Sequence, residues 1–442
     1  MIPFVHLIAA KRDGRRHTVE EIRRVVEAVC DPGQTPDYQV AAWLMAAYLN
    51  GLTPEETYEL TIAMRDSGIV IRTPDLPSPR IDKHSTGGVG DKTTLVVTPL
   101  LAALGVPVVK LSGRGLGFTG GTTDKLAAIP GFRTALSIRE AVAVAAQCGA
   151  VVAGASAELA PADKRLYHLR DVTGTVSSIP LIAASIMSKK LASGADAVVL
   201  DVKTGAGSTV GSLEDARALA STMVDIGLRA AVPTLAVVSD MDQPLGRTIG
   251  NALEVAEACE ALTDPDGADL RLLDLCVELA AVGLVAAGRR DTLASARADC
   301  RRALHSGEAA AVFERMVELQ GGDPRVVRNP DLLAGASSVA PVRAEVGGMV
   351  EAIDPLALGV LSVGLGAGRY RVDDEIDPAV GIVLRRTVGE TVAAGDVLAE
   401  LHLRACANGA EASATVRAAY TIGPGPAISR PVILGSVELG RA

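Results

Sequence analysis

Two glycine-rich loops hold most of the side chains in this chain that could do chemistry. The first spans Ser85–Gly90, within KHSTGGVGD, and the second spans Gly113–Gly121, within SGRGLGFTGGTTDK. Backbone N–H groups in such turns converge on an anion, hydroxyl groups add hydrogen-bond donors, and lysine adds positive charge. A single loop of this kind is as often a plain tight turn. Two such loops, both flanked by lysine, favour a phosphate-binding site.

Lysine is scarce outside this part of the chain. Nine of the 43 basic residues are lysine, and eight of these nine lie between residues 83 and 203. Arginine cannot replace a compact ammonium group in a tight site, so these lysines mark positions where geometry excludes arginine; drift in composition is the alternative. The eight are Lys83, Lys92, Lys110, Lys125, Lys164, Lys189, Lys190 and Lys203.

The overall composition argues against several classes of partner. The net charge of −9 does not suit a surface that binds nucleic-acid duplexes, so we expect no nucleic-acid partner. The longest apolar stretch, Leu95–Val109, is too short to span a bilayer, so we expect no membrane partner. The six cysteines are widely spaced and the N-terminus is unlike a secretion signal. These features predict a cytoplasmic protein without zinc or disulfides.

Helix caps and apolar periodicity predict three regions in the 442 residues. Residues 1–70 form a small all-α domain, with capping boxes that begin at Thr18 and Thr53. Residues 80–335 alternate between strands and helices, which predicts a large α/β domain with a mainly parallel sheet and ligands at the carboxyl ends of its strands. Residues 340–442 form a C-terminal β-rich portion, similar to the barrel-like hammerhead of biotin and lipoyl carriers. It has no lysine to modify, so we expect a structural role.

Several elements of the middle region can be placed. Short apolar runs predict strands at Val106–Lys110, Ala150–Ala153, Ala197–Val202 and Thr234–Ser239. Helical spacing and caps predict helices at Ser137–Gly149, Ala160–Leu169, Pro180–Ala192 and Ser212–Gly227, with further helix through 251–316.

The two loop sequences resemble the thymidine and pyrimidine-nucleoside phosphorylases, and the second is close to that family's signature. The likeness covers essentially the whole chain and continues through Leu159–Lys164, Arg170-Asp171, Ser185–Lys190 and Gly250–Glu254. It implies a homodimer that needs no cofactor, in which residues 160–192 complete the small helical domain. The implied substrates are a pyrimidine nucleoside and inorganic phosphate.

The implied reaction is phosphorolysis of uridine, thymidine or deoxyuridine to the free base and (deoxy)ribose 1-phosphate. Phosphate attacks C1′ directly, the sugar passes through an oxocarbenium-like state, and the base leaves as an anion. No nucleophile–base pair and no pair of acids stands out in the sequence. This absence fits a reaction in which the protein positions an external nucleophile and stabilises charge.

Matching to the family's motifs assigns roles to single residues. The phosphate-contacting positions are Lys83, Ser85, Thr94, Lys110, Ser112 and Thr122. The substrate-contacting positions are His84, Arg170, Ser185, Lys189 and Phe118. Of these, the resemblance implies His84, Arg170 and Lys189 as the catalytic residues. Lys110 matches the family's broader-specificity enzymes, which favours uridine in addition to deoxynucleosides.

The chemistry of these side chains supports the pyrimidine-contacting set. Ser185 and Lys189 are four residues apart on one predicted helix and share a face. Arg170 offers a fork of donors, and His84 can donate a hydrogen bond or a proton to the departing ring. Two alternatives stay open: Arg170 can be a surface ion pair with Asp171, and Lys189 with its neighbour can be a solvated helix end.

Members of the broader-specificity type can hold a potassium ion. The matching positions here are Gly90, Lys92, Leu245, Thr248 and Glu257, and lysine stands at 92 where that type has threonine. We expect the Lys92 ammonium to take the place of the cation and to pair with Glu257. Potassium dependence is therefore predicted to be weak or absent.

Two departures from the family's pattern remove a polar and a charged group near the site. Phe118 stands where histidine is usual, and Ala127 stands where glutamate is usual. These changes are either drift or the sign of a reshaped sugar pocket, for instance one specialised for a 5′-amino-5′-deoxyuridine in a biosynthetic pathway. They are also the sole support for a non-catalytic paralogue that binds pyrimidine nucleosides. A phosphoribosyltransferase of the same fold, such as the anthranilate enzyme, is a further alternative and would need acidic residues for magnesium.

Overall fold

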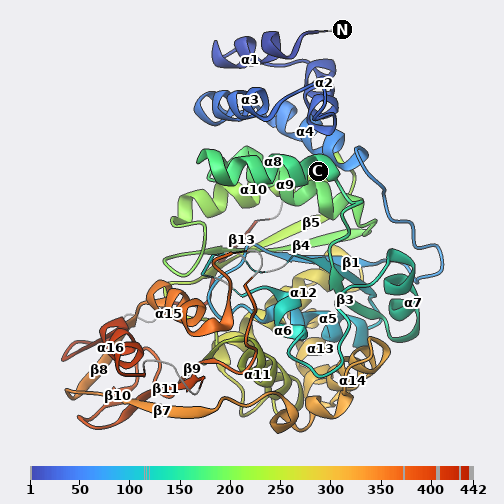
Figure 1. The fold of residues 1–442 in the computed structure, drawn as a ribbon. Coiled ribbons are helices and arrows are strands. Elements are labelled where there is room, and N and C mark those ends of the chain that lie inside the picture. The colour runs from blue at the N-terminus through green and yellow to red at the C-terminus, as the bar shows by residue number, and fades with distance from the viewer. Residues whose placement is uncertain are drawn as a thin grey trace.

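A computed structural model describes residues 2–113, 115, 117–118, 120–371, 374–404, 409–427 and 430–437 (Figure 1). Arg114, Leu116 and Thr119 of the second loop lie outside the described residues. The chain forms a helical part at the top of the view, an α/β part below it and a strand-rich part at one side. The predicted fold class is confirmed.

The helical part combines two segments that lie far apart in the sequence. Its members are α1 (Phe4–Arg12), α2 (Val19–Cys30), α3 (Asp37–Asn50), α4 (Pro54–Asp66), α8 (Pro161–Thr173) and α9 (Ile179–Ala192). Capping boxes start α2 at Thr18 and α4 at Thr53. Leu166 and Leu181 join Trp43 and its neighbours in one buried apolar cluster. The later helices therefore complete the core of the N-terminal ones.

A six-stranded sheet forms the centre of the molecule, in the order β13-β5-β4-β1-β2-β3. The strands are β1 (Ile81–Ser85), β2 (Val108–Ser112), β3 (Ala150–Gly154), β4 (Ala197–Thr204), β5 (Thr234–Asp240) and β13 (Ile433–Val437). β1 to β5 run parallel, whereas β13 is antiparallel to β5. The chain builds outward from β1 through β2 and β3, and then returns to build β4 and β5 on the other side. This reversal places a ligand-binding crevice at the carboxyl ends of the central strands.

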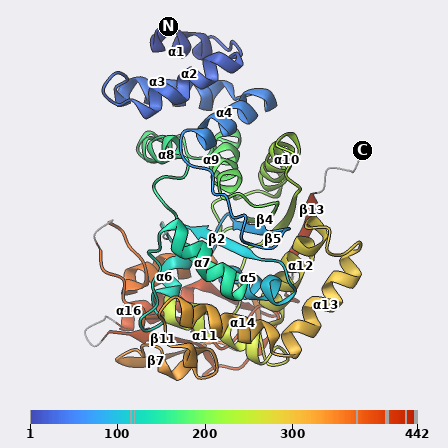
Figure 2. The ribbon, with the colours of Figure 1, turned by 90° about the vertical axis from the view of Figure 1, so that its right-hand side faces the viewer.

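Helices cover both faces of this sheet (Figures 1 and 2). The helices of the α/β part are α5 (Thr93–Ala103), α6 (Thr122–Leu126), α7 (Ile138–Cys148), α10 (Leu213–Arg229), α11 (Asn251–Thr263), α12 (Leu270–Ala286), α13 (Leu293–His305) and α14 (Glu308–Leu319), followed by the 3₁₀ turns η1 (Pro324–Val327) and η2 (Pro330–Leu332). Val199 faces the largest apolar cluster, which includes residues of α5 and α12. Val198 and Leu200 face a second cluster with α9 and α10. Because α9 packs on the sheet and also belongs to the helical part, it joins the two.

The strand-rich part contains two small sheets, ordered β10-β8-β12 and β6-β9-β11-β7. Its elements are β6 (Thr248–Ile249), β7 (Ser338–Arg343), β8 (Gly348–Ile353), α15 (Pro355–Ser362), the π-helical turn η3 (Val363–Ala367), β9 (Gly381–Leu384), β10 (Thr391–Val392), β11 (Val397–Leu403), α16 (Gly409–Ala419) and β12 (Tyr420–Gly423). β6 comes from the α/β part and so ties the two parts together.

Two features differ from the sequence-based expectation. The strand predicted from Val106 begins at Val108, because Pro107 has no N–H to give to the ladder and its carbonyl accepts from Ile81 instead. The C-terminal residues were predicted to belong to the β-rich portion, but β13 extends the central sheet. Among the described residues, no helix is long and apolar enough to cross a bilayer.

Candidate functional site

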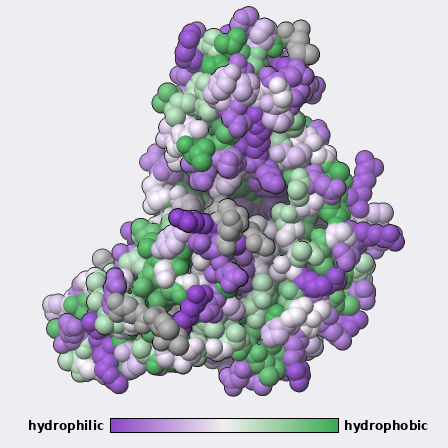
Figure 3. Space-filling model, viewed as in Figure 1, coloured by the Kyte–Doolittle hydropathy of each residue, from purple (hydrophilic) through white to green (hydrophobic). Residues whose placement is uncertain are grey.

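The predicted site residues gather at the carboxyl ends of β1, β2 and β4. The loop after β1 needs glycine at Gly90, where φ is +79° and an added Cβ would lie 2.5 Å from the carbonyl oxygen of Leu245. Gly88 forms an antiparallel bridge with Ser208 in the loop after β4. The surface is hollowed between the helical part and the lower body (Figure 3). The two loops therefore meet at the crevice that the sheet order predicts.

Lys83 is the centre of the predicted phosphate-contacting set. Its side chain is fully buried, and Nζ donates to Thr93 Oγ1 at 2.6 Å and to Thr94 Oγ1 at 3.5 Å. The Ser85 hydroxyl donates to Asp91 Oδ2 at 2.5 Å. Asp91 Oδ1 accepts from the Thr93 hydroxyl at 2.6 Å. Asp91 therefore holds two hydroxyl groups of the site in place.

Buried charged residues next to the phosphate-contacting set form ion pairs with Lys83 and Asp91. Lys203 Nζ lies 2.9 Å from Asp201 Oδ2 and 3.9 Å from Asp91 Oδ1, and Lys83 Nζ lies 3.6 Å from Asp201 Oδ2. Burial alone would raise the pKa of Asp91, but the charges of Lys203, Lys83 and Lys125 outweigh it and hold this pKa well below its usual value. The carboxylate therefore stays charged at neutral pH.

Three further positions of the phosphate-contacting set lie on β2 and α6. Lys110 is buried near the end of β2, and its Nζ lies 3.9 Å from Asp82 Oδ1. Ser112 ends the same strand, and Thr122 begins α6; both side chains are half-buried. Lys125 is tied to Glu254 at 2.6 Å and donates to the carbonyl of Asp91 at 2.5 Å. The second loop is thereby fastened to the first.

His84 is close enough to lysines of both the phosphate-contacting and the pyrimidine-contacting set to feel their charges. Its Nε2 atom is buried and has no hydrogen-bond partner among the described residues. Burial lowers the pKa of His84 well below its usual value, and the charges of Lys110, Lys190, Lys83 and Lys189 lower it further. The ring is therefore neutral at neutral pH. It can offer one N–H as a hydrogen-bond donor, but it is not an imidazolium acid.

Lys189 is held by two neighbours on the helical side of the site. Nζ donates to Asp163 Oδ2 at 2.5 Å and to Ser185 Oγ at 3.2 Å, and more than a third of the side chain is exposed. The ammonium group has a third N–H that remains for a ligand. Lys190 is also not a solvated helix end, because it is buried and pairs with Asp82 at 2.7 Å. The solvated-end interpretation is wrong for both lysines.

Arg170 is almost fully buried and does not form the surface ion pair that its neighbour Asp171 suggested. Its guanidinium donates to the carbonyl oxygens of Thr175, Val176 and Leu181, at 3.4, 2.5 and 3.1 Å. Burial lowers its pKa, against the opposing charge of Asp163. The fork braces the turn between α8 and α9, and two of its five N–H groups are left for other acceptors.

Phe118 packs against the apolar core of the strand-rich part. Its carbonyl oxygen would be 2.8 Å from a Cβ added at Gly359 on α15, so the second loop lies close to that helix. Ala127, the other departure, is exposed just after α6. The second loop thus bridges the α/β part and the strand-rich part.

Lys92 lies among the residues that the family resemblance assigns to potassium. Its fully buried ammonium donates to the carbonyls of Leu245 and Thr248 at 3.1 and 3.0 Å, to Thr248 Oγ1 at 3.1 Å and to Glu257 Oε2 at 2.5 Å. These oxygens are therefore already engaged by a positive charge. The residues do not fit an additional cation.

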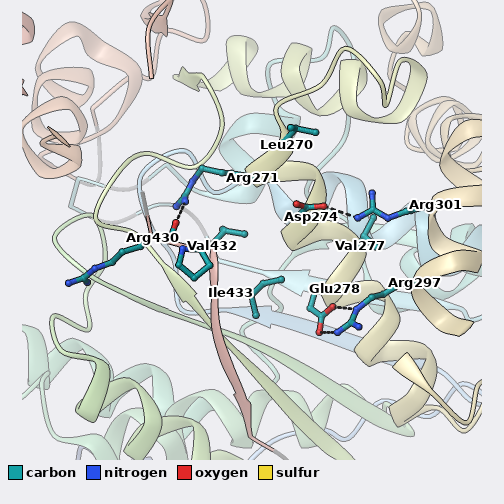
Figure 4. A pocket seen from close by; sticks show the side chains of 11 residues that line it. Leu270, Arg271, Asp274, Val277, Glu278, Arg297, Arg301, Arg430, Val432 and Ile433 are labelled. Atoms are coloured by element: carbon teal, nitrogen blue, oxygen red, sulfur yellow. Dashed lines mark hydrogen bonds and ion pairs between the residues drawn. The ribbon is translucent and has the colours of Figure 1, made fainter. Parts of the chain in front are cut away.

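Two cavities are not lined by the predicted phosphate- or pyrimidine-contacting residues, although Thr248 and Glu257 line the second. The first, of about 400 Å³, lies between α12, α13 and the segment before β13, and four arginines line it (Figure 4). Each arginine is matched by a carboxylate; Arg297 pairs with Glu278 and Arg301 with Asp274. The second, of about 560 Å³, lies between α11 and the strand-rich part. Because the arginine charges are neutralised within the protein, the first cavity does not compete with the candidate site.

Sequence reasoning missed several members of the site. Asp91, Asp163 and Lys203 lie within or beside the motifs, but only the fold reveals that they hold other site residues. Asp201 had a readable signal, since it interrupts the buried apolar run of β4 with a charge, whereas Asp82 lies in the polar sequence of β1 and had none. Buried carboxylates of this kind are normally paired.

Family models match the chain in three consecutive pieces. Residues 5–68 match the helical bundle domain of a glycosyl transferase family, and residues 78–310 match its α/β domain. Residues 349–423 match the pyrimidine nucleoside phosphorylase C-terminal domain.

Similar proteins of known name agree with these matches. The chain is 48% identical over 399 residues to pyrimidine-nucleoside phosphorylases of Staphylococcus haemolyticus (strain JCSC1435) and Geobacillus stearothermophilus, across 90% of this chain and 92% of each relative. Its fold is similar to that of anthranilate phosphoribosyltransferase from Thermus thermophilus, with a TM-score of 0.56, 23% identity, and coverage of 71% of this chain and 99% of that chain. At that identity the likeness to the transferase concerns the fold alone. The chain belongs to the pyrimidine-nucleoside phosphorylase family.

Proposed function

We propose that this protein is an enzyme that cleaves pyrimidine nucleosides by phosphorolysis. An oxygen of inorganic phosphate attacks C1′ as the bond from C1′ to the base nitrogen breaks, and the bonding electron pair leaves with the base. The products are the free pyrimidine and a (deoxy)ribose 1-phosphate. The names of the relatives support this reaction class.

The observation that supports the proposal is that lysines of two sets of donors act on the ring of His84. One set, on β1, β2 and α5, is rich in lysine and hydroxyl groups and suits phosphate. The other, on α8 and α9, offers Arg170, Ser185 and Lys189, which suit the carbonyl edge of a pyrimidine. The charges of both sets act on the His84 ring. A nucleoside between the sets would place its C1′ between phosphate and base donors.

The proposed roles follow from the charge that develops during the reaction. The leaving pyrimidine becomes an anion, and the ammonium of Lys189 and the guanidinium of Arg170 stabilise it electrostatically. Neutral His84 donates a hydrogen bond to the ring rather than a proton from an imidazolium. Lys83 and Lys110 hold the attacking phosphate, and the hydroxyl groups of Thr94 and Ser85 orient it.

We propose uridine, thymidine and deoxyuridine as the substrates. A test is phosphate-dependent release of base from these three nucleosides and from 5′-amino-5′-deoxyuridine, measured side by side. Turnover of the first three is expected, with uridine among the good substrates because of Lys110. Turnover of the 5′-modified compound alone would point to a specialised enzyme. Pyrimidine binding without turnover would point to a binding protein.

We also propose that the protein is a cytoplasmic homodimer. On α3, an apolar stripe of Tyr38, Met45 and Leu49 is exposed at helical spacing on the outside of the helical part. Val172 on α8 is exposed as well. The exposure of these apolar residues supports the dimer, in which a second copy would cover them. The five cysteines of the described residues, all free thiols, support a reducing compartment.

A further inference from the structure

Asp82 is a buried carboxylate that faces the side-chain nitrogens of two lysines. Its Oδ2 accepts from Lys190 Nζ at 2.7 Å, and its Oδ1 lies 3.9 Å from Lys110 Nζ. The side chains of all three residues are at most 5% exposed. One carboxylate therefore faces two lysines where water does not screen charge, so it cannot balance both of them as ammonium ions.

The fold holds these three groups on separate elements. Asp82 lies on β1, Lys110 on β2 and Lys190 on α9. β1 and β2 pair at a single position, Ile81 with Val108, so Asp82 and Lys110 lie beyond the paired part of the two strands. Lys190 is closer to the carboxylate and makes the better hydrogen bond. Lys110 is left with the weaker contact.

The neighbouring groups do not supply the missing negative charge. Lys83 on β1 and Lys189 on α9 add positive charge, and His84 is neutral. The nearest other carboxylates, Asp163 and Asp201, are engaged by Lys189 and Lys203. Burial lowers the pKa of Lys110 well below its usual value, and the charge of Lys190 lowers it further, although Asp82 opposes both.

We propose that inorganic phosphate binds together with one proton: Lys110 is a neutral amine in the empty site and becomes an ammonium ion when the phosphate dianion brings the missing negative charge. The proton comes from the solvent and adds to Lys110 Nζ. It stays there through phosphorolysis, because the proton of the attacking HPO4²⁻ passes to the leaving pyrimidine anion and the sugar 1-phosphate product is again a dianion; the Lys110 proton leaves when this product dissociates. The inference rests on the proposed function, because it requires Lys110 to face phosphate.

The test is calorimetric titration of the full-length protein with inorganic phosphate at about pH 8.5, where free phosphate is already a dianion. The titration is repeated in two buffers that differ in their ionisation enthalpy. The difference in binding heat gives the number of protons taken up. We expect about one proton per phosphate for the wild-type protein.

A pair of variants at Lys190 makes the test specific. Lys190→Met leaves Asp82 to Lys110 alone, so Lys110 is already charged in the empty site and the uptake falls to about zero while phosphate still binds. Lys190→Arg keeps the competing charge, because arginine does not deprotonate, and the uptake remains. Lys11→Met serves as the control, since Lys11 is equally buried but forms a one-to-one pair with Glu56 in the helical part. Its uptake should equal that of the wild type.

Three results would overturn the proposal. The first is a wild-type protein that binds phosphate without proton uptake; in that case base release still continues and the proposed function stands. The second is unchanged uptake in Lys190→Met, which would assign the proton to another group. The third is a wild-type protein that neither binds phosphate nor releases base, which would end the proposed function as well.

Discussion

The ring of His84, for which we propose the role of a neutral donor, is held in a setting that changes its titration. Its pKa is lowered by burial and by the charges of neighbouring lysines, so the native protein does not protonate this ring near its ordinary pKa. The unfolded chain does protonate it below about pH 6.5. The native state therefore loses stability relative to the unfolded state as the pH falls below that value.

Nitrogen NMR of labelled histidine offers a direct test. At about pH 6, His305 should be largely protonated, because the carbonyl of Arg301 and the carboxylate of Asp266 raise its pKa. His84 should still be neutral at that pH. The variant His84→Gln assigns the signal. A His84 ring that titrates together with His305 would show that the site is open to water and would remove the neutral-donor role.

Asp163 is a positioning residue for Lys189. In Asp163→Asn the ammonium loses its carboxylate partner at 2.5 Å, and we expect kcat/KM for the nucleoside to fall at least about tenfold. The KM for phosphate should change little, because Asp163 lies on the helical side. Lys164→Met, at the exposed next position, is the matched control. If kcat fell and the KM for phosphate rose to a similar extent, the variant would instead show a general loss of structure.

At this scale the sequence identifies residues but not their partners. The motifs single out His84, Lys83, Ser185 and Lys189, and the structure brings them to one place. Asp82 could not be assigned, because its partners lie 28 and 108 positions away in the sequence, on another strand and on a helix. Contacts at such separations depend on strand order, which local patterns do not specify.

At the scale of the secondary-structure elements, the buried ion pair of Lys92 with Glu257 holds the start of α5 in place. Lys92 precedes that helix, and its ammonium joins the loop at Leu245 to β6 and to Glu257 on α11. We propose that it replaces a bound potassium ion, as expected from the lysine that stands where threonine is usual. The pair Lys92–Glu257 is buried at both ends.

Activity should therefore be the same in sodium and potassium buffers. In Lys92→Thr, the buried Glu257 would lose its charged partner and keep only hydrogen bonds from Arg247 and Thr248, which costs about 3–5 kcal/mol, and the melting temperature should fall sharply. Potassium chloride should restore part of the lost stability and activity of that variant, whereas the wild type should not respond. Strong activation of the wild type by potassium would disprove the substitution.

The elements themselves were largely predictable. The capping box at Ser137 starts α7 as expected, and the apolar runs at β3, β4 and β5 form strands at the predicted places. β13 was not predictable, because Ile433–Val437 reads as another short β segment and nothing local says which sheet it joins. Its partner β5 lies in another part of the molecule. The β propensity of a segment does not specify its neighbour.

At the scale of the whole molecule, the exposed stripe on α3 is the feature that an isolated chain does not explain. Leu49 and Tyr38 are both more than 70% exposed, one at each end of the helix. Apolar groups arranged at helical spacing on an outer face usually mark a protein interface.

Light scattering coupled to size exclusion should give the mass of a dimer for the wild type. Leu49→Glu should shift the protein toward the monomer, because it places a charge on the stripe that the dimer interface would bury. Leu228→Glu, at an equally apolar but solitary exposed site on α10, should leave the mass unchanged. A dimer that persists in both variants would place the interface elsewhere.

The position of β13 has a consequence for the synthesis of the protein on the ribosome. β5 ends at Asp240 and β13 begins at Ile433, so 433 − 240 = 193 positions separate the two strands that pair. At translation rates of about 5–20 residues per second, the ribosome completes β5 roughly 10–40 seconds before it reaches β13. During that time a parallel sheet with an open edge is available for pairing with other nascent chains. The speed of translation through the last two hundred codons should therefore influence how much protein reaches the folded state.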